Sequence, residues 1–314
     1  MAEDLDLSVR LGNSLLLRTP LLAASGTFGF GFEMEKVGGH QGYGALISKG
    51  TSVEPRVGNE PPRIAEVPAG MLNAIGLQNP GVEVVAGDYA PRWGEWDVPV
   101  IVNVVGDSVE DYVAVVERLE PAPAVAGIEL NISCPNVGAK GLMFGVDAQM
   151  AHQVTAAVRA VTARPLIVKL SPNVTDLVSI AMAIVDAGAD ALSAVNTYVG
   201  MMLDLDSGRP VLANVTGGLS GPAIRPLALH AVYTVSRAVS VPVIASGGVM
   251  SGEDAIEFLL AGAVAVQIGT LNFLRPDAGR FVLQGIDAHM RRQKLGSVAA
   301  IRPADAAVEE EAIR

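Results

Sequence analysis

Eight short apolar runs, separated by segments with helical patterning, most restrict the fold that this chain can adopt. The runs are rich in Val, Ile, Leu and Ala, which is typical of strands buried on both faces of a parallel sheet. Strands that alternate with helices in this way predict an α/β protein, and eight of them predict a closed (β/α)8 TIM barrel. The runs span 21–25, 45–49, 98–104, 127–131, 165–169, 191–196, 241–246 and 265–270.

Helix signals between the runs support this architecture. A helix is predicted over 108–120, with Ser108 as its N-cap. Another is predicted over 175–190, with Thr175 as its N-cap and Gly188 as its stop. Two further helices are predicted over 223–240 and 253–263.

Two segments interrupt the regular alternation. Residues 50–97 are too long for an ordinary connection from strand to helix, and we expect an insertion that covers the C-terminal face of the barrel. Residues 133–147 form a long glycine-rich loop after the fourth run, and long loops are often functional. The whole chain, 1–314, is expected to be a single domain.

Charge and cysteine usage exclude several classes of protein. The net charge of −11 and the pI of about 4.8 argue against a nucleic-acid partner, which needs a basic surface. A single cysteine excludes an internal disulfide, an iron–sulfur cluster and a cysteine-rich zinc site in this chain, and no metal site is predicted. The sequence shows no signal peptide and no run of about 18 apolar residues, so we expect a cytoplasmic protein that does not enter a membrane.

Five of the apolar runs carry an amine or an amide as their last or next-to-last residue, and in a parallel barrel these ends share the rim that carries catalytic residues. One polar strand end is explained by contact with water, but five that are all Lys or Asn favour a site for a polar, anionic, planar molecule. The five residues are Lys49, Asn103, Asn131, Lys169 and Asn196.

The last two runs end in glycine-containing loops that are suited to phosphate. Gly247 and Gly248 precede a helix expected near Gly252, and Gly269 and Thr270 end the final strand. Turns use glycine freely, but the loops after strands seven and eight are where barrels commonly bind phosphate. A monophosphate such as FMN fits better than a dinucleotide, because no GxGxxG motif follows a strand.

The only cysteine, Cys134, stands in the sequence NISCPN after the fourth run. The usual fate of a free thiol is to be buried and inert. A Cys–His pair is disfavoured, because none of the four histidines is at a predicted strand end. A general base remains, and such a base facing a flavin suits C–H oxidation.

Several longer motifs resemble class 1 dihydroorotate dehydrogenases over nearly the whole chain, and NAIGLQNPG resembles the class 1B catalytic subunit in particular. The motifs are SKGTSVEPRVGNEPPRIAEVPAGMLNAIGLQNPG, NISCPNV, PLIVKLSPNVTD, AVNTYVGMMLD, NVTGGLSGPAIRP, ASGGV and QIGTLNF. The loop wording GAKGLMFGVDAQ departs from the commoner family form.

The resemblance implies oxidation of dihydroorotate to orotate in pyrimidine (UMP) biosynthesis, with Cys134 taking the C5 proton and FMN taking hydride from C6. Implied substrate contacts are Lys49, Asn73, Ala74, Ile75, Gly76, Leu77, Asn131, Asn136, Asn196 and Thr197. Implied FMN contacts are Ser25, Lys49, Gly50, Asn103, Asn131, Lys169, Val195, Gly221, Gly247, Gly248, Gly269 and Thr270.

The resemblance also implies a partner. Class 1B enzymes pass electrons to NAD through a subunit that carries FAD and a [2Fe–2S] cluster, and a homodimer of catalytic subunits is flanked by two such subunits in a heterotetramer. Alternatives are a dihydropyrimidine dehydrogenase catalytic subunit and a fumarate-dependent class 1A enzyme. A flavin-free lyase or isomerase with a Schiff base on Lys169, or a non-catalytic phosphate-binding barrel, would be of a different class.

Overall fold

Eight parallel strands close into a barrel at the centre of the computed structural model, which describes residues 5–12, 15–133 and 144–301. Each strand falls within or overlaps one of the eight apolar runs, so the predicted (β/α)8 barrel is confirmed. The order around the barrel is β10-β13-β14-β3-β4-β7-β8-β9. The strands are β3 (Leu21–Ala23), β4 (Ala45–Ile47), β7 (Val100–Val104), β8 (Val125–Asn131), β9 (Leu166–Lys169), β10 (Ala191–Ala194), β13 (Val243–Ser246) and β14 (Ala265–Ile268).

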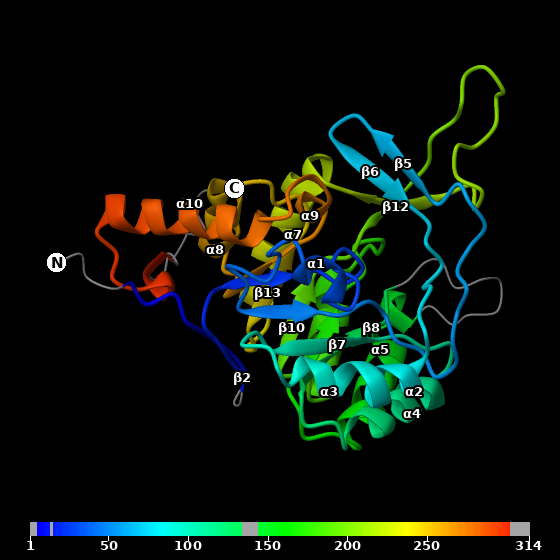
Figure 1. Cartoon of the computed structure of the whole chain (residues 1–314), viewed down its shortest axis with the longest axis horizontal. Coiled ribbons are helices and arrows are strands. Elements are labelled where there is room, and N and C mark those ends of the chain that lie inside the picture. The colour runs from blue at the N-terminus through cyan, green and yellow to red at the C-terminus, as the bar shows by residue number, and fades with distance from the viewer. Residues whose placement is uncertain (1–4, 13–14, 134–143, 302–314) are drawn as a thin grey trace.

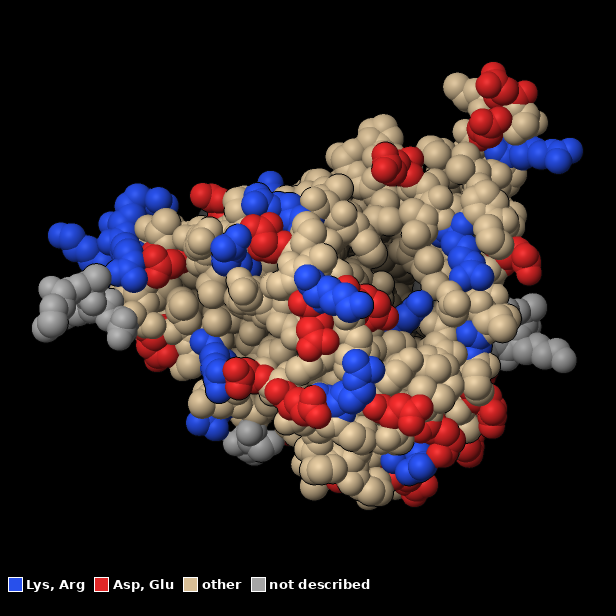
Figure 2. Space-filling view, viewed as in Figure 1, with Lys and Arg blue, Asp and Glu red and all other residues tan. Residues whose placement is uncertain are grey.

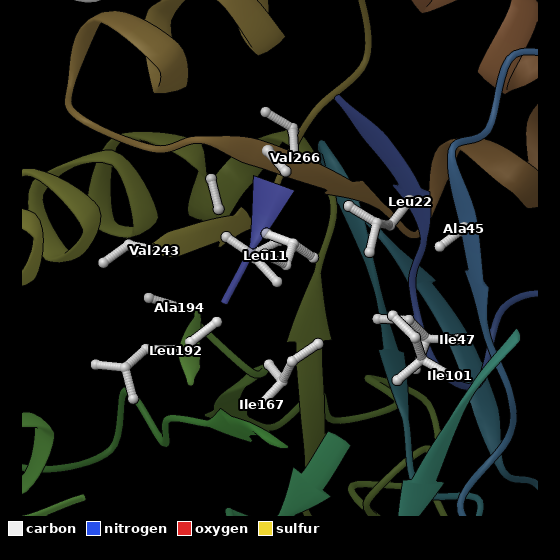
Figure 3. Packing of buried hydrophobic residues seen from close by; sticks show 14 of the residues in the cluster. Leu11, Leu22, Ala45, Ile47, Ile101, Ile167, Leu192, Ala194, Val243 and Val266 are labelled. Atoms are coloured by element: carbon white, nitrogen blue, oxygen red, sulfur yellow. The ribbon is translucent and has the colours of Figure 1, made fainter. Parts of the chain in front are cut away.

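Apolar side chains from these strands form the main core (Figure 3). Leu22, Ile47 and Ile101 are all fully buried, and burying a side chain of this size stabilises the fold by roughly 1.5–3 kcal/mol. The N-terminal hairpin of β1 (Val9–Leu11) and β2 (Leu15–Leu17) adds Leu11 to the same cluster. Gly12, which follows β1, approaches Asp190, the residue before β10, so this end of β1 lies at the N-terminal end of the barrel.

Helices surround the barrel, and their N-caps follow local sequence. Ser108 caps its helix as predicted, because its Oγ accepts from Asp111 N at 3.1 Å. The predicted cap Thr175 is wrong: Asp176 accepts from Ser179 N at 3.0 Å and begins the next helix. A carboxylate suits this position better, because it also favours the positive end of the helix dipole.

The glycine stop of that helix is confirmed. Gly188 follows the C-cap with a φ of 97°, a left-handed conformation that favours glycine. The longer helices are α4 (Val109–Leu119), α5 (Ala148–Arg159), α6 (Leu177–Asp186), α7 (Arg225–Ala238), α8 (Gly252–Leu260) and α10 (Ala278–Gln293). The shorter ones are α1 (Phe32–Glu35), α2 (Val82–Val84), η1 (Val85–Tyr89), α3 (Ala90–Trp93), η2 (Phe144–Val146), η3 (Pro222–Ile224), α9 (Leu271–Leu274) and η4 (Val298–Ile301).

A second sheet, which we call the covering sheet, has the strand order β11-β12-β6-β5. Its strands β5, β6 and β12 project beyond the barrel at the upper right of Figure 1. The four strands are β5 (Ile64–Val67), β6 (Gly70–Asn73), β11 (Tyr198–Gly200) and β12 (Gly217–Ser220). The sheet therefore joins a segment that follows β4 to one that follows β10.

The second half of segment 50–97 has a different place. Val82, Val85 and Trp93, on α2, η1 and α3, are buried in the main core, so these short helices belong to the layer around the barrel. In the parts of the chain that the structure describes, no helix has the length and apolar character needed to cross a membrane.

Candidate active site

A cavity of about 340 Å³ lies at the carboxyl ends of the barrel strands, with the covering sheet forming one wall. Its volume is within the range of small-molecule sites. The face shown in Figure 2 is hollowed near its centre, beside the covering sheet, and both basic and acidic side chains lie at the rim of the hollow. The floor and walls come from segments far apart in the sequence, which is how a parallel barrel assembles a site.

The five polar strand-end residues all line this cavity. Asn131 and Lys169 are the last residues of β8 and β9, and Asn103 is the next-to-last residue of β7. Lys49 and Asn196 each follow their strand by two residues. The structure thus brings two amines and three amides to one rim.

The two lysines are held in different environments. Lys49 is partly buried, and burial is the largest cause that lowers the pKa of its ammonium; the Glu33 carboxylate opposes this shift and Arg63 adds to it. Lys169 is only 5% exposed, and its Nζ donates to Gln267 Oε1 at 3.4 Å. Among the described residues, neither ammonium has a carboxylate within 4.0 Å. An anionic ligand in the cavity would therefore be stabilised by both.

Hydrogen bonds between strand ends fix the amides at the rim. Asn196 Nδ2 donates to Ser133 Oγ at 2.8 Å, and Ser133 Oγ donates to Asn131 Oδ1 at 3.1 Å. The Asn196 Oδ1 accepts from the backbone N–H of Thr197 at 2.8 Å. These bonds hold Asn131 and Asn196 in defined orientations, which is a requirement for recognising a planar polar ring.

The covering sheet supplies the opposite wall. Asn73 at the end of β6 donates to Gly218 O at 3.2 Å and lines the cavity together with Ile75, Gly76 and Leu77. Ala74 does not line it, because its side chain is buried in a small cluster with Leu72 and Leu212. The sheet thus places a polar amide and a short turn over the rim.

Glycine loops form the other end of the cavity. Gly247 and Gly248 have φ values of 134° and 80°, and a Cβ on Gly248 would lie 2.8 Å from the backbone of Arg225. Such loops expose main-chain N–H groups to an anion. Thr270 lies beside them and donates to Ser220 Oγ at 2.9 Å. The remaining lining residues with an implied FMN contact are Ser25, Gly50, Val195, Gly221 and Gly269.

This two-ended lining fits a phosphorylated planar cofactor such as FMN. Bare backbone at one end suits the phosphate, and the amines and amides across the middle suit a polar ring. Among the described residues, no group of three or more His, Cys, Asp or Glu could hold a metal ion.

Two predicted site residues cannot be placed in the cavity, and the cavity has lining residues that were not predicted. Cys134 and Asn136 lie outside the described residues. The cavity also has lining residues that the motifs did not single out; several adjoin predicted ones, while Ile64, Met71 and Phe273 are apolar and carry no chemical signal. The unpredicted residues are Ala24, Gly26, Thr27, Ile64, Met71, Gln78, Ser220, Ile224, Ser246, Val249 and Phe273.

Known proteins similar to this chain agree on one family. The family model described as dihydroorotate dehydrogenase matches residues 9–290. Two curated relatives, from Geotalea daltonii and Geobacter sulfurreducens, carry the name "Dihydroorotate dehydrogenase B (NAD(+)), catalytic subunit" and are 52% and 50% identical over 293 residues. Each alignment covers 93% of this chain and 96% of the relative.

A solved structure shows the same fold. The crystal structure of DHODH in complex with ferulenol from Eimeria tenella matches with a TM-score of 0.77 at 23% identity. The match covers 96% of this chain and 88% of that chain.

Proposed function

This chain belongs to the dihydroorotate dehydrogenase family, and from that membership we propose that it is the catalytic subunit of an NAD-linked dihydroorotate dehydrogenase. Such an enzyme oxidises dihydroorotate to orotate in pyrimidine biosynthesis. The observation that carries the proposal is that Lys49, Asn103, Asn131, Lys169 and Asn196 line one cavity whose far end consists of glycine loops.

FMN is the proposed cofactor of this chain. When bound, it supplies the hydride acceptor of the oxidation. Asn103, Lys169 and Val195 would contact its ring, and the loops of Gly247, Gly248 and Thr270 would hold its phosphate. The other proposed contacts are Ser25, Lys49, Gly50, Asn131, Gly221 and Gly269. The lysine ammonium groups favour negative charge that develops on a bound ring.

Dihydroorotate carries ring amides and a carboxylate, which match the polar lining. Asn73, Asn131 and Asn196 offer both amide donors and acceptors to the ring, and Lys49 offers a positive charge to the carboxylate. Thr197 and the turn of Ile75, Gly76 and Leu77 complete the proposed substrate contacts. In segment 133–147, the proposed active-site loop, Cys134 would remove the C5 proton and Asn136 would bind substrate; both lie outside the described residues.

The covering sheet gives this site its boundary. Its strand β6 and the turn after it contribute Met71, Asn73 and residues 75–77 to the lining, so part of the proposed insertion 50–97 lies over the cavity. We therefore propose that residues 1–314 form one FMN-binding barrel domain, in which this sheet limits the access of water to the substrate.

A partner subunit is proposed to carry the electrons to NAD. The name of the relatives, "catalytic subunit", supports such a partner. Four ligands hold a [2Fe–2S] cluster, and this chain has one cysteine, so a cluster would reside on the partner. FAD is proposed to reside on the same partner, as in the class 1B enzymes that the sequence resembles. The proposed assembly is a homodimer of this chain flanked by two partner subunits, in the cytoplasm.

Turnover measurements test the activity. The chain is co-expressed with its partner subunit and assayed with NAD and dihydroorotate; reduction of NAD is the expected result. Dihydrouracil lacks the carboxylate and is expected to be a poor substrate, while fumarate is expected to be a poor acceptor. Faster oxidation of dihydrouracil than of dihydroorotate would contradict the proposed substrate, and efficient fumarate reduction without a partner would contradict the proposed acceptor.

A further inference from the structure

Beneath the floor of the cavity lies a buried carboxylate that the proposed mechanism does not use. Glu129 is on β8, is 0% exposed and does not line the cavity. Each of its two oxygens accepts one amide hydrogen bond of 2.7 Å, from Asn103 Nδ2 on β7 and from Gln267 Nε2 on β14. Strand β14 is four places from β8 in the barrel order, so this contact crosses the barrel interior.

A carboxylate determines the orientation of amides that contact it. When ionised it offers acceptors only, so an amide that faces it must present its NH2 group and turn its carbonyl oxygen away. In this structure Asn103 and Gln267 both point their NH2 groups at Glu129. The carbonyl oxygen of each amide accepts a hydrogen bond on the side that faces the cavity.

The Asn103 oxygen continues into the rim. Asn131 Nδ2 donates to Asn103 Oδ1, and Asn196 Nδ2 donates to Asn131 Oδ1, each at 3.4 Å. The donors therefore run in one direction, from Asn196 through Asn131 and Asn103 to the Glu129 carboxylate. The three cavity-lining amides therefore form a hydrogen-bond chain with a single donor-to-acceptor direction, and the buried carboxylate is the final acceptor of this chain.

The Gln267 oxygen holds the buried lysine. Its Oε1 accepts from Lys169 Nζ at 3.4 Å, while its Nε2 faces Glu129. Gln267 is 1% exposed and does not line the cavity. The Glu129 carboxylate thus acts on Lys169 through the single amide of Gln267.

We propose that Glu129 is a positioning residue that sets the hydrogen-bond polarity of the cavity floor. Through Asn103 it fixes which atoms of the three asparagines face a ligand, and through Gln267 it orients the Lys169 ammonium. The proposal deepens the proposed function and rests on it for the identity of the ligand, FMN.

Replacing Glu129 by glutamine tests polarity rather than size. The substituted side chain would present an NH2 group of its own, and one of the two facing amides must then turn to offer an oxygen. If Asn103 turns, its NH2 faces Asn131 and the rim; if Gln267 turns, its NH2 faces the Lys169 ammonium. Either arrangement leaves donor against donor, which destabilises a buried network.

Exchanging the side chains of Glu129 and Gln267 is expected to restore the hydrogen-bond polarity of the network. In Glu129→Gln combined with Gln267→Glu, the new glutamine accepts from Asn103 Nδ2 and donates to the new carboxylate. That carboxylate then accepts from Lys169 directly. Every donor regains an acceptor and the charge of the network is unchanged, so the polarity of the asparagines returns.

The experiment compares FMN binding to the full-length chain by quenching of flavin fluorescence, with melting temperatures measured alongside. Glu129→Gln is expected to raise the dissociation constant for FMN about tenfold, which corresponds to the free-energy cost of leaving one buried polar group without a hydrogen-bond partner. Gln267→Glu alone, which sets two carboxylates together, is expected to weaken binding similarly. The exchange variant is expected to return to within about threefold of wild type. Glu117→Gln, the same change on the exposed face of α4, serves as the matched control and is expected to bind as wild type does.

The outcomes separate this proposal from the proposed function. A folded Glu129→Gln that binds FMN like wild type would overturn the positioning role, and so would an exchange variant that binds no better than the single variants. If Glu129→Gln does not fold, the exchange variant must fold and bind FMN, or the proposal fails. If wild type itself does not bind FMN, the proposed function fails. The melting temperatures then still test the polarity of the network: both single variants are expected to melt below wild type, and the exchange variant is expected to melt near wild type.

Discussion

Asn196 Nδ2 donates a hydrogen bond of 2.8 Å to Ser133 Oγ, which joins the segment after β10 to the segment after β8, the two strands on either side of β9 in the barrel. Ser133 precedes Cys134 in the sequence and also donates to Asn131 Oδ1. The amides proposed to bind the substrate and the start of the proposed active-site loop are therefore held by the same small network.

Asn196→Ala is expected to impair catalysis without releasing the cofactor. It removes one proposed substrate contact and leaves Ser133 Oγ without its donor, so kcat/KM for dihydroorotate should fall about tenfold to a hundredfold. Steady-state kinetics and the flavin absorption spectrum provide the two readouts. Unchanged kcat/KM would show that Asn196 does not contact the substrate.

The affinity for orotate is expected to fall as the pH rises through the lowered pKa of Lys49, at a pH below the ordinary lysine value of 10.5. The charged ammonium attracts the carboxylate, and the attraction disappears with the proton. Titration calorimetry measures this, and Lys49→Met is expected to bind orotate weakly without this pH-dependent component. The free energy of unfolding changes with pH in the opposite direction. Because the folded state disfavours the proton on Lys49, the contribution of this residue to stability rises as the pH rises over the same window.

Gly248→Ala is expected to weaken FMN binding about tenfold or more. The φ of 80° disfavours any side chain, and a Cβ would lie 2.8 Å from the Arg225 backbone, so the loop that offers its N–H groups to the phosphate must move. Fluorescence titration checks this. The control is Gly87→Ala in η1, where a Cβ meets nothing within 4 Å; equal loss of affinity in both variants would contradict the proposed phosphate loop.

Thr175 and Asp176 are both suited to cap α6, and in the structure Asp176 is the N-cap. Asp176→Ala is expected to lower the free energy of unfolding by about 0.5–2 kcal/mol, because Ser179 N loses its acceptor. Thr175→Ala is expected to have a smaller effect. Urea denaturation measures both, and a larger loss for Thr175→Ala would contradict the cap that the structure shows.

Much of the fold could be predicted from the sequence because each barrel strand is a local apolar run, such as LIVK at β9. The rim residues could be predicted for the same reason, since Asn131 and Lys169 end their runs. Ser108 is predictable as a cap from its position alone, whereas Thr175 and Asp176 are adjacent and only the hydrogen bond distinguishes them.

The rest depends on contacts between distant segments. Strand β12 has the sequence GGLS, which has little strand propensity and is ordered by pairing with β6. In the sequence Glu129 is only a polar interruption in an apolar run, because its partners Asn103 and Gln267 are 26 and 138 positions away. Ala74 is expected at the site from its place in a motif, but the strand direction turns its side chain into the small cluster.

Anaerobic addition of dihydroorotate to the purified, FMN-reconstituted chain tests the central claim most directly. The visible flavin absorbance is expected to bleach within the turnover time of the enzyme, without any partner subunit, because hydride transfer needs only this chain and its cofactor. Cys134→Ala, with the same flavin content, is expected to bleach far more slowly at neutral pH. A wild-type chain that retains FMN but keeps its colour in excess dihydroorotate, or a Cys134→Ala variant that bleaches as fast as wild type, would contradict the account.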